Sequence, residues 1–316
     1  MHHSGRKIVH RAIEITAPPA STDALIRELE KSDHLISLSV HRGASIKPPG
    51  DVLMVRALNR DADRVMQLVD KARMNGQISV TTHELTSIVD PEHEREVAND
   101  FDEALWEESE TSLRHQGRPT ANYLVLMALG GALAATAFVE TGSSQTISLV
   151  AASIIAPGFE PLAKIPVGLA LRRWSVVGRG LWSVGAGYLT LALAAALVFA
   201  VLRLTGVGTT GEFLGNPETK VLTDPTLREV LVSSFGALAG ITMIVAYRRS
   251  VIAGPLIALA IVPAAAMVGV ALAAGSPTLA YQGAERFVLD VIVIVAWGAL
   301  VVALKQVFVH RGRPIV

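Results

Sequence analysis

The sequence predicts a protein in two parts, an α+β domain with the ferredoxin-like (βαββαβ) order of elements followed by an all-α membrane domain of six transmembrane helices. The first observation is a split in charge near residue 120. The residues before it contain 15 Lys/Arg and 20 Asp/Glu, whereas those after it contain 13 and 8, spread thinly between apolar runs. The second observation is that these runs reach the ~20 residues that a bilayer crossing requires. We therefore expect a cytosolic domain at 1–90, a connector helix at 91–118 and a membrane domain at 119–316.

The elements of the first domain follow from changes in hydrophobic periodicity. Alternating apolar residues predict strands at 8–15, 35–40, 52–57 and 78–88. Helical spacing predicts one helix after the cap Ser21-Thr22-Asp23 and a second that opens at Asp61. Gly43–Gly50 is the expected hairpin loop. This order is the split-βαβ pattern, and it resembles the ligand-sensing domains of amino-acid-type regulators, so we expect a regulatory role with the ligand left open.

Catalytic and metal chemistry has no visible residue set in the first domain. The chain has no cysteine, which excludes disulfides, thiolate catalysis and Cys-type zinc sites. The histidines at 10, 34, 41 and 83 lack metal-ligand spacing, so we expect solvated surface side chains and no metal or other cofactor. The net charge of zero is a cancellation between the two parts and says nothing about nucleic acid. No basic patch is interleaved with aromatic residues, so we expect no nucleic-acid partner.

The connector is strongly acidic. Ten Asp/Glu lie between Asp90 and Glu110 against a single base, Arg95. Val97, Phe101, Leu105 and Trp106 recur at helical spacing, which predicts an amphipathic helix. Its acidic side is either a solvated face of a helix packed on the first domain or a surface that senses a partner or an ion, and the first interpretation is favoured.

The membrane part contains six apolar segments of spanning length. They are Tyr123–Val139, Ile147–Leu171, Gly180–Leu202, Val230–Tyr247, Val251–Ala274 and Phe287–Phe308. Basic residues gather in alternate connections, at 114–118, 172–179 and 248–249 and after 305. By the positive-inside rule both termini are cytoplasmic, in a multi-pass protein of the inner (plasma) membrane, with the lipid bilayer as its surroundings.

An internal repeat is visible in the membrane part. Gly131–Ala134 recurs as Gly236–Ala239, 105 residues later, and Pro157 recurs as Pro263, 106 residues later. Three helices per unit would place the second unit upside down, which is the 3+3 inverted repeat with broken helices that is typical of transporters. Exposed Gly/Ala faces, as in Gly236-x-x-x-Gly240, favour close helix packing and a homo-oligomer.

The stretches around the two prolines resemble a known family. Ser153–Pro157 with Pro161, and Ala260–Pro263 within Gly254–Ala274, resemble a bacterial and archaeal family catalogued as domain of unknown function 389. The resemblance covers essentially the whole membrane part, and some members also carry a soluble amino-terminal region. It implies an architecture and no particular activity.

Glu160 is the first candidate for a functional residue. It lies within an apolar span, where a carboxylate is costly and normally faces the bundle interior or water. Pro157 removes a backbone donor, Gly158 loosens the chain, and Pro161 suits the first turn of a resumed helix. Lys164 lies one turn later on the same face. The pair is either an ion or proton relay that also receives an anionic solute, or a neutralised structural pair; the first interpretation is slightly favoured.

Other polar residues of the membrane part are weaker candidates. Asp290 is next, although an interfacial charge near Arg286 is the favoured interpretation. Ser153 is assigned with Glu160, Lys164, Pro157, Gly158 and Pro263 to a central binding site. Tyr188, Thr190, Ser233 and Ser234 could line a path, but such residues more often hydrogen-bond between helices. The glycines of 206–211 fit G-x-G-x-x-G without the strand and helix that this motif requires.

These patterns predict a membrane transporter or channel-like protein that moves a small ion or anionic solute and carries a cytoplasmic regulatory domain. The alternative is a non-transporting sensor or scaffold whose soluble domain binds a ligand or partner. A membrane enzyme is not expected, because the sequence shows neither a nucleophile motif nor a metal cluster.

Overall fold

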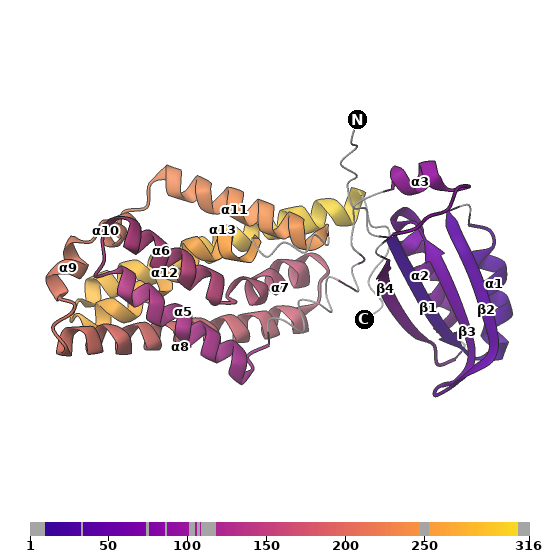
Figure 1. Cartoon of the computed structure of the whole chain (residues 1–316), viewed down its shortest axis with the longest axis horizontal. Helices are drawn as coiled ribbons and strands as arrows, with labels where there is room; N and C mark the ends of the chain where they lie inside the picture. Colours follow the sequence, from indigo (N-terminus) through magenta and orange to yellow (C-terminus); the bar gives the residue numbers. More distant parts are fainter. Residues whose placement is uncertain are drawn as a thin grey trace. The chain divides into compact units, whose positions relative to one another are not determined.

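A computed structural model describes residues 10–32, 34–73, 76–85, 87–100, 105, 108, 118–246 and 253–308 (Figure 1). The chain divides into two compact units. One contains the sheet and runs to Ser109, together with the residues from Gln306 onward; the other runs from Glu110 to Lys305 and contains most of the helices. The sequence places its boundaries at 90 and 118, on either side of this division.

The first unit has the predicted order of elements. They are β1 (His10–Ala17), α1 (Pro19–Leu29), β2 (Leu35–Ile46), β3 (Pro49–Ala57), α2 (Asn59–Arg73) and β4 (Ser79–Leu85). The sheet is antiparallel throughout, in the order β2-β3-β1-β4. Ile13 and Ile15 pair with Val55 and Leu53. Alternate residues of a strand point to one face, so these four form a buried core with the apolar sides of α1 and α2.

The hairpin between β2 and β3 is longer than predicted. The strands continue to Ile46 and resume at Pro49, so most of the expected loop is strand. Gly43 has a positive φ of 60°, in the register shift between His41 and Ser45. Its backbone N–H donates to Asp51 Oδ1 over 2.8 Å, which holds the kinked strand in place. Gly43, which the sequence predicts to lie in a loop, is therefore the site of a β-bulge.

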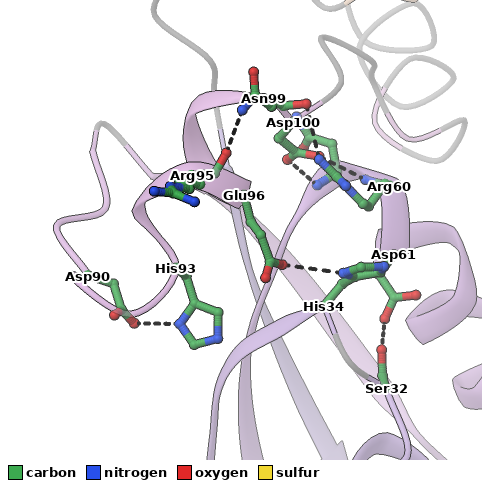
Figure 2. Close-up of polar contacts among 11 residues, drawn as sticks. Ser32, His34, Arg60, Asp61, Asp90, His93, Arg95, Glu96, Asn99 and Asp100 are labelled. Carbon is green, nitrogen blue, oxygen red and sulfur yellow. Dashed lines mark hydrogen bonds and ion pairs between the residues drawn. The ribbon is translucent and has the colours of Figure 1, made fainter.

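The predicted acidic connector contains a short helix, α3 (Glu94–Ala98), in its described part. Figure 2 shows how this segment is attached to the start of α2. The carboxylate of Asp100 accepts hydrogen bonds from the backbone N–H of Asn59 at 2.6 Å and from Arg60 Nε at 3.3 Å. Glu96 lies 3.4 Å from His34. Phe101 and Trp106, on which the long-helix prediction depended, lie outside the described residues.

One prediction for the histidines is wrong. His10 is buried, with 2% of its surface exposed, and its Nδ1 lies 3.3 Å from the carboxylate of Asp100. The alternation of the first strand places this side chain beneath the segment around Asp100, which the sequence alone could not bring there. Among the described residues no group of three His, Asp or Glu could hold a metal ion.

The second unit is helical. Its elements are α5 (Ala121–Ala137), α6 (Gly142–Ile155), α7 (Phe159–Ala170), α8 (Trp174–Leu204), α9 (Thr210–Gly215), α10 (Pro217–Thr223), α11 (Leu227–Val245), α12 (Ala253–Ala273) and α13 (Pro277–Phe308). Of the described helices, α8 and α13 are long and apolar enough to cross a membrane, with 31 and 32 residues. The pair α6 and α7, bent by 54°, would be a third. These helices indicate a membrane protein.

Glycines set the close approach of helices around α8. A methyl group added at Gly131 of α5 would overlap the carbonyl oxygen of Leu191, and one at Gly269 of α12 would overlap that of Ala192. Both carbonyls belong to neighbouring residues of α8. Because only glycine permits such contact, α5 and α12 are fixed on α8 at the same level of that helix.

The two repeated prolines have different effects on the backbone. At Pro157 the helix is interrupted between Ile155 and Phe159, as the sequence predicts. At Pro263 the predicted break is absent, because α12 runs unbroken from Ala253 to Ala273. Proline is tolerated inside membrane helices when neighbouring groups accommodate the lost hydrogen bond. Pro157 is followed by Gly158, whereas Pro263 is followed by the helix former alanine.

Candidate functional site

The break between α6 and α7 is the centre of the candidate site (Figure 1). Ala156 is extended, with φ −77° and ψ 111°, and ends α6. Pro157 offers no backbone donor, and the N–H of Gly158 turns back to the carbonyl of Ala156 over 2.8 Å. Pro161 lies in the first turn of α7, where its missing N–H costs nothing. The chain therefore changes direction here because of its own local chemistry.

Glu160 occupies the first turn of α7. Its Oε2 is buried and has no hydrogen-bond partner among the described residues. Its Oε1 lies 3.8 Å from the position that a Cβ on Gly254 would take, at the start of α12. The carboxylate thus lies near the first turns of two helices, whose amino ends carry partial positive charge. The partial positive charge of these helix ends offsets part of the cost of placing a carboxylate here, and no described group hydrogen-bonds to its Oε2.

Lys164 follows one helical turn after Glu160 and is 3% exposed. The charges of Glu160, Arg118 and Arg179 all act on its ammonium group. A Cβ on Gly180 of α8 would lie 3.2 Å from the Cβ of Lys164, so α7 and α8 pack closely at this level. The structure therefore brings the two predicted charges together, with additional basic residues on the Lys164 side.

Tyr188 of α8 is a residue that sequence reasoning left out of the central site. A Cβ on Gly158 would lie 2.8 Å from its Cζ, so the phenol lies against the break. Its hydroxyl is buried and has no hydrogen-bond partner in the described part of the chain. Its ring packs on Phe287 with centroids 4.8 Å apart. Nothing in the spacing of the sequence marks this residue; only the crossing of α8 with α7 does.

Tyr123 of α5 is the second tyrosine near Glu160. Its hydroxyl donates a hydrogen bond to the carbonyl of Ser183 over 3.2 Å. The charge of Glu160 acts on both Tyr123 and Tyr188. The two phenols differ in that the Tyr123 hydroxyl is occupied by a backbone acceptor, whereas that of Tyr188 is not.

Asp290 belongs to a buried cluster on α13. Its Oδ2 accepts a hydrogen bond from Arg286 Nε over 2.9 Å, and its Oδ1 accepts one from Ser233 Oγ over 3.0 Å. Asp290 is 1% exposed and Arg286 5%. The helix begins at Pro277 rather than at the predicted Phe287, so both charges lie well inside it. Arg286 Nη1 is buried and lacks a hydrogen-bond partner among the residues described.

The structure gives Ser153 and Pro263, the remaining predicted site residues, structural positions within their own helices. The hydroxyl of Ser153 donates to the carbonyl of Leu149 over 2.9 Å, within its own helix. Pro263 lies buried in the continuous α12, between Val262 and Ala264. The sequence did contain one signal for the Arg286–Asp290 pair. Their i,i+4 spacing could have predicted an ion pair within one helix instead of an interfacial charge.

Comparison with known proteins identifies one family. A family model described as "Domain of unknown function (DUF389)" matches residues 153–296. The match begins within α6 and ends within α13, so it includes Glu160, Lys164, Tyr188, Arg286 and Asp290. The family resemblance that the sequence indicates is thereby confirmed over this segment. No curated protein and no solved structure gives a match to the chain.

Proposed function

We propose, with the match of residues 153–296 to the DUF389 family as the premise, that this protein is a membrane transporter or channel-like protein for a small ion or anionic solute. The observation that carries the proposal is the carboxylate of Glu160 at a helix break, whose Oε2 is buried and has no hydrogen-bond partner among the described residues. A charge within an apolar bundle is costly, and such residues mark ion and solute pathways. Broken helices with free amide ends are where transporters bind their substrates.

The basic side of the site favours an anionic solute. Lys164 is buried on α7, and Arg118 and Arg179 act on it electrostatically. An anion that enters from this side would meet positive charge before it reaches Glu160. Glu160 would then repel a bound anion when ionised and accept it when neutral, which would link solute release to the charge of one carboxylate.

The architecture proposed for this function has six crossings, with both termini cytoplasmic and the protein in the plasma membrane. Each of the six predicted segments overlaps a described helix, or a bent helix pair. The basic connections at 172–179 and the base-free connection after α5 support the orientation. We still propose that the two sets of three helices are inverted relative to each other, but without a second broken helix at Pro263. Cysteine scanning with impermeant thiol reagents would test the number of crossings and the orientation, because the chain has no native cysteine.

The first unit is proposed as a ferredoxin-like regulatory domain. The order βαββαβ and the antiparallel sheet β2-β3-β1-β4 support this assignment. Homo-oligomerisation remains part of the proposal, and mass measurement of the detergent-solubilised full chain would test it. The alternative function, a sensor or scaffold without transport, is favoured by the same regulatory domain if the helical unit proves impermeable.

The test is a flux assay on the full chain in phosphatidylethanolamine–phosphatidylglycerol vesicles. Chloride, acetate, potassium and sodium are the probes. We expect one of them to move, and Glu160→Gln to lower the flux by about tenfold or more, which corresponds to ~1.4 kcal/mol or more of lost stabilisation. Glu285→Gln is the matched control, since Glu285 is exposed on α13. Fluxes equal to those of empty vesicles, or a Glu160→Gln variant with unchanged flux, would contradict the proposal.

A further inference from the structure

Besides Thr219 on α10, three side chains of the helical unit carry a buried polar atom without a hydrogen-bond partner among the described residues. They are Glu160 Oε2, Tyr188 Oη and Arg286 Nη1. An unsatisfied buried polar atom is destabilising, so each such atom calls for an explanation, and a bound water molecule or ion is the usual one. Their presence in three different helices, α7, α8 and α13, suggests a shared occupant.

Tyr188 connects the other two. Its phenol lies against Gly158, two residues before Glu160 in the chain. On its other side its ring packs on Phe287, the residue that follows Arg286. The charges of Glu160 and of Asp290 both act on its hydroxyl. The hydroxyl of Tyr188 is therefore an intermediate point between the helix break and the Arg286–Asp290 pair.

The surroundings of Tyr188 contain few other titratable groups. Tyr123 faces it from α5, Glu160 and Lys164 come from α7, and Arg286 and Asp290 from α13. Ser233 of α11 contacts Asp290, and α12 has no titratable side chain in its sequence. The Tyr123 hydroxyl is committed to the carbonyl of Ser183, which leaves Tyr188 as the hydroxyl able both to donate and to accept.

We propose that Glu160, Tyr188 and the Arg286–Asp290 pair, joined by water molecules, form a proton path, so that the coupling ion of this protein is H⁺. This inference rests on the proposed transport function and names its ion. A proton taken up by Glu160 passes through water to Tyr188 Oη as the phenol releases its own proton toward Asp290. The Asp290 carboxylate takes that proton and loosens its bond to Arg286, then gives it to water on the far side. One proton enters and one leaves, and every side chain returns to its starting form.

The positions of Glu160 and of the Arg286–Asp290 pair, the two ends of the proposed path, agree with a path across the helical unit. Beyond Glu160, α7 leads to Lys164 and then to the basic connection at 172–179, the predicted cytoplasmic side. On the other side the charge of Arg286 acts on Glu218 of α10, in the long connection that is predicted to lie outside. Along this path a carboxylate lies on each side of the Tyr188 hydroxyl, and chains of such side chains form the proton relays of membrane proteins.

The experiment uses the full chain in phosphatidylethanolamine–phosphatidylglycerol vesicles that contain a pH-sensitive dye. A potassium gradient with valinomycin supplies an inside-negative membrane potential, and the dye reports proton entry as acidification of the vesicle lumen. We expect wild-type proton flux above that of empty vesicles and a loss of about tenfold or more in Tyr188→Phe, equivalent to ~1.4 kcal/mol or more. This variant removes only the oxygen and keeps the ring on Phe287. Tyr281→Phe is the matched control, since Tyr281 is 70% exposed on the same helix as Asp290.

The outcomes separate this inference from the proposed function. A wild-type protein that moves chloride, acetate, sodium or potassium, but no protons, overturns the proton path and leaves transport standing. A wild-type protein that moves none of these ions and no protons overturns both. Proton flux that persists in Tyr188→Phe overturns the role of this hydroxyl. Elution as a single species and an unchanged unfolding temperature for Tyr188→Phe show that a lost flux is not a folding defect.

Discussion

The phenol of Tyr188 occupies the space in which a side chain at Gly158 would lie, so α8 closes directly over the break between α6 and α7. This contact joins a local feature of the backbone to a residue 30 positions further along the chain. Because no side chain separates them, the hydroxyl reaches the level of Glu160. The function proposed for the break depends on this close approach.

Gly158→Ala should destabilise the helical unit. The added methyl group overlaps the Tyr188 hydroxyl, and such overpacking costs about 1–3 kcal/mol. We expect a lower unfolding temperature of the detergent-solubilised full chain, measured by light scattering and intrinsic fluorescence. Gly178→Ala is the control, because nothing lies within 4 Å of a Cβ at that position of α8. Partial recovery in Gly158→Ala/Tyr188→Phe would assign the loss to this contact, and no recovery would contradict that assignment.

The Arg286–Asp290 pair should be more sensitive to the loss of one partner than to the loss of both. Removing one partner of a buried pair leaves an uncompensated charge and costs about 3–5 kcal/mol. We expect Arg286→Met to unfold at a much lower temperature than wild type, and Arg286→Met/Asp290→Leu to recover a large part of the difference. The measurement is thermal unfolding of the full chain. A double variant as unstable as Arg286→Met would show that the pair does not act as a unit.

Pro263→Ala should leave the fold intact, because α12 is already continuous through this residue. Alanine restores one backbone donor and is smaller than the proline ring that it replaces, so we expect an unfolding temperature at least equal to that of wild type. Pro157→Ala should instead lower proton or solute flux, because it permits α6 to extend into the break. Equal effects of the two substitutions on flux would argue that both prolines form breaks.

The hairpin of the first unit should weaken in acid. The backbone N–H of Gly43, followed by smaller contributions from Thr22 and then the Arg42 guanidinium, holds the pKa of Asp51 below its usual 3.8. A carboxyl group with a lowered folded pKa stabilises above its unfolded pKa, and this contribution is lost as the pH falls through the folded value. We expect faster hydrogen exchange in peptides of 35–57 for Asp51→Asn than for wild type at pH 7. After correction for intrinsic rates, the difference should shrink once the pH falls below 3.8.

Asp70→Asn is the control for the hairpin, because Asp70 is exposed on α2. It should exchange as wild type does at both pH values. A difference between Asp51→Asn and wild type that is constant from pH 7 to the acid range would contradict the role given to the ionised carboxylate.

The sequence by itself determined the features that depend on neighbouring residues. The alternation and helical spacing before residue 90 gave the order βαββαβ, since side-chain periodicity is a property of each local backbone. Pro157 and Gly158 predicted a break because proline lacks a donor and glycine adds freedom, and both effects act within one turn. The apolar runs marked the helices of the second unit, although their number of membrane crossings stays a prediction.

Only the tertiary structure decided which distant side chains meet. The burial of His10 under Asp100 and the depth of Asp290 with Ser233 depend on how elements pack, which no periodicity encodes. Pro263 shows the same limit, since α12 is continuous through it although an identical residue breaks the chain at 157. Tyr188 reaches Gly158 because helices packed through small residues approach backbone to backbone. Local chemistry therefore set the break, and packing between helices chose the hydroxyl that faces it.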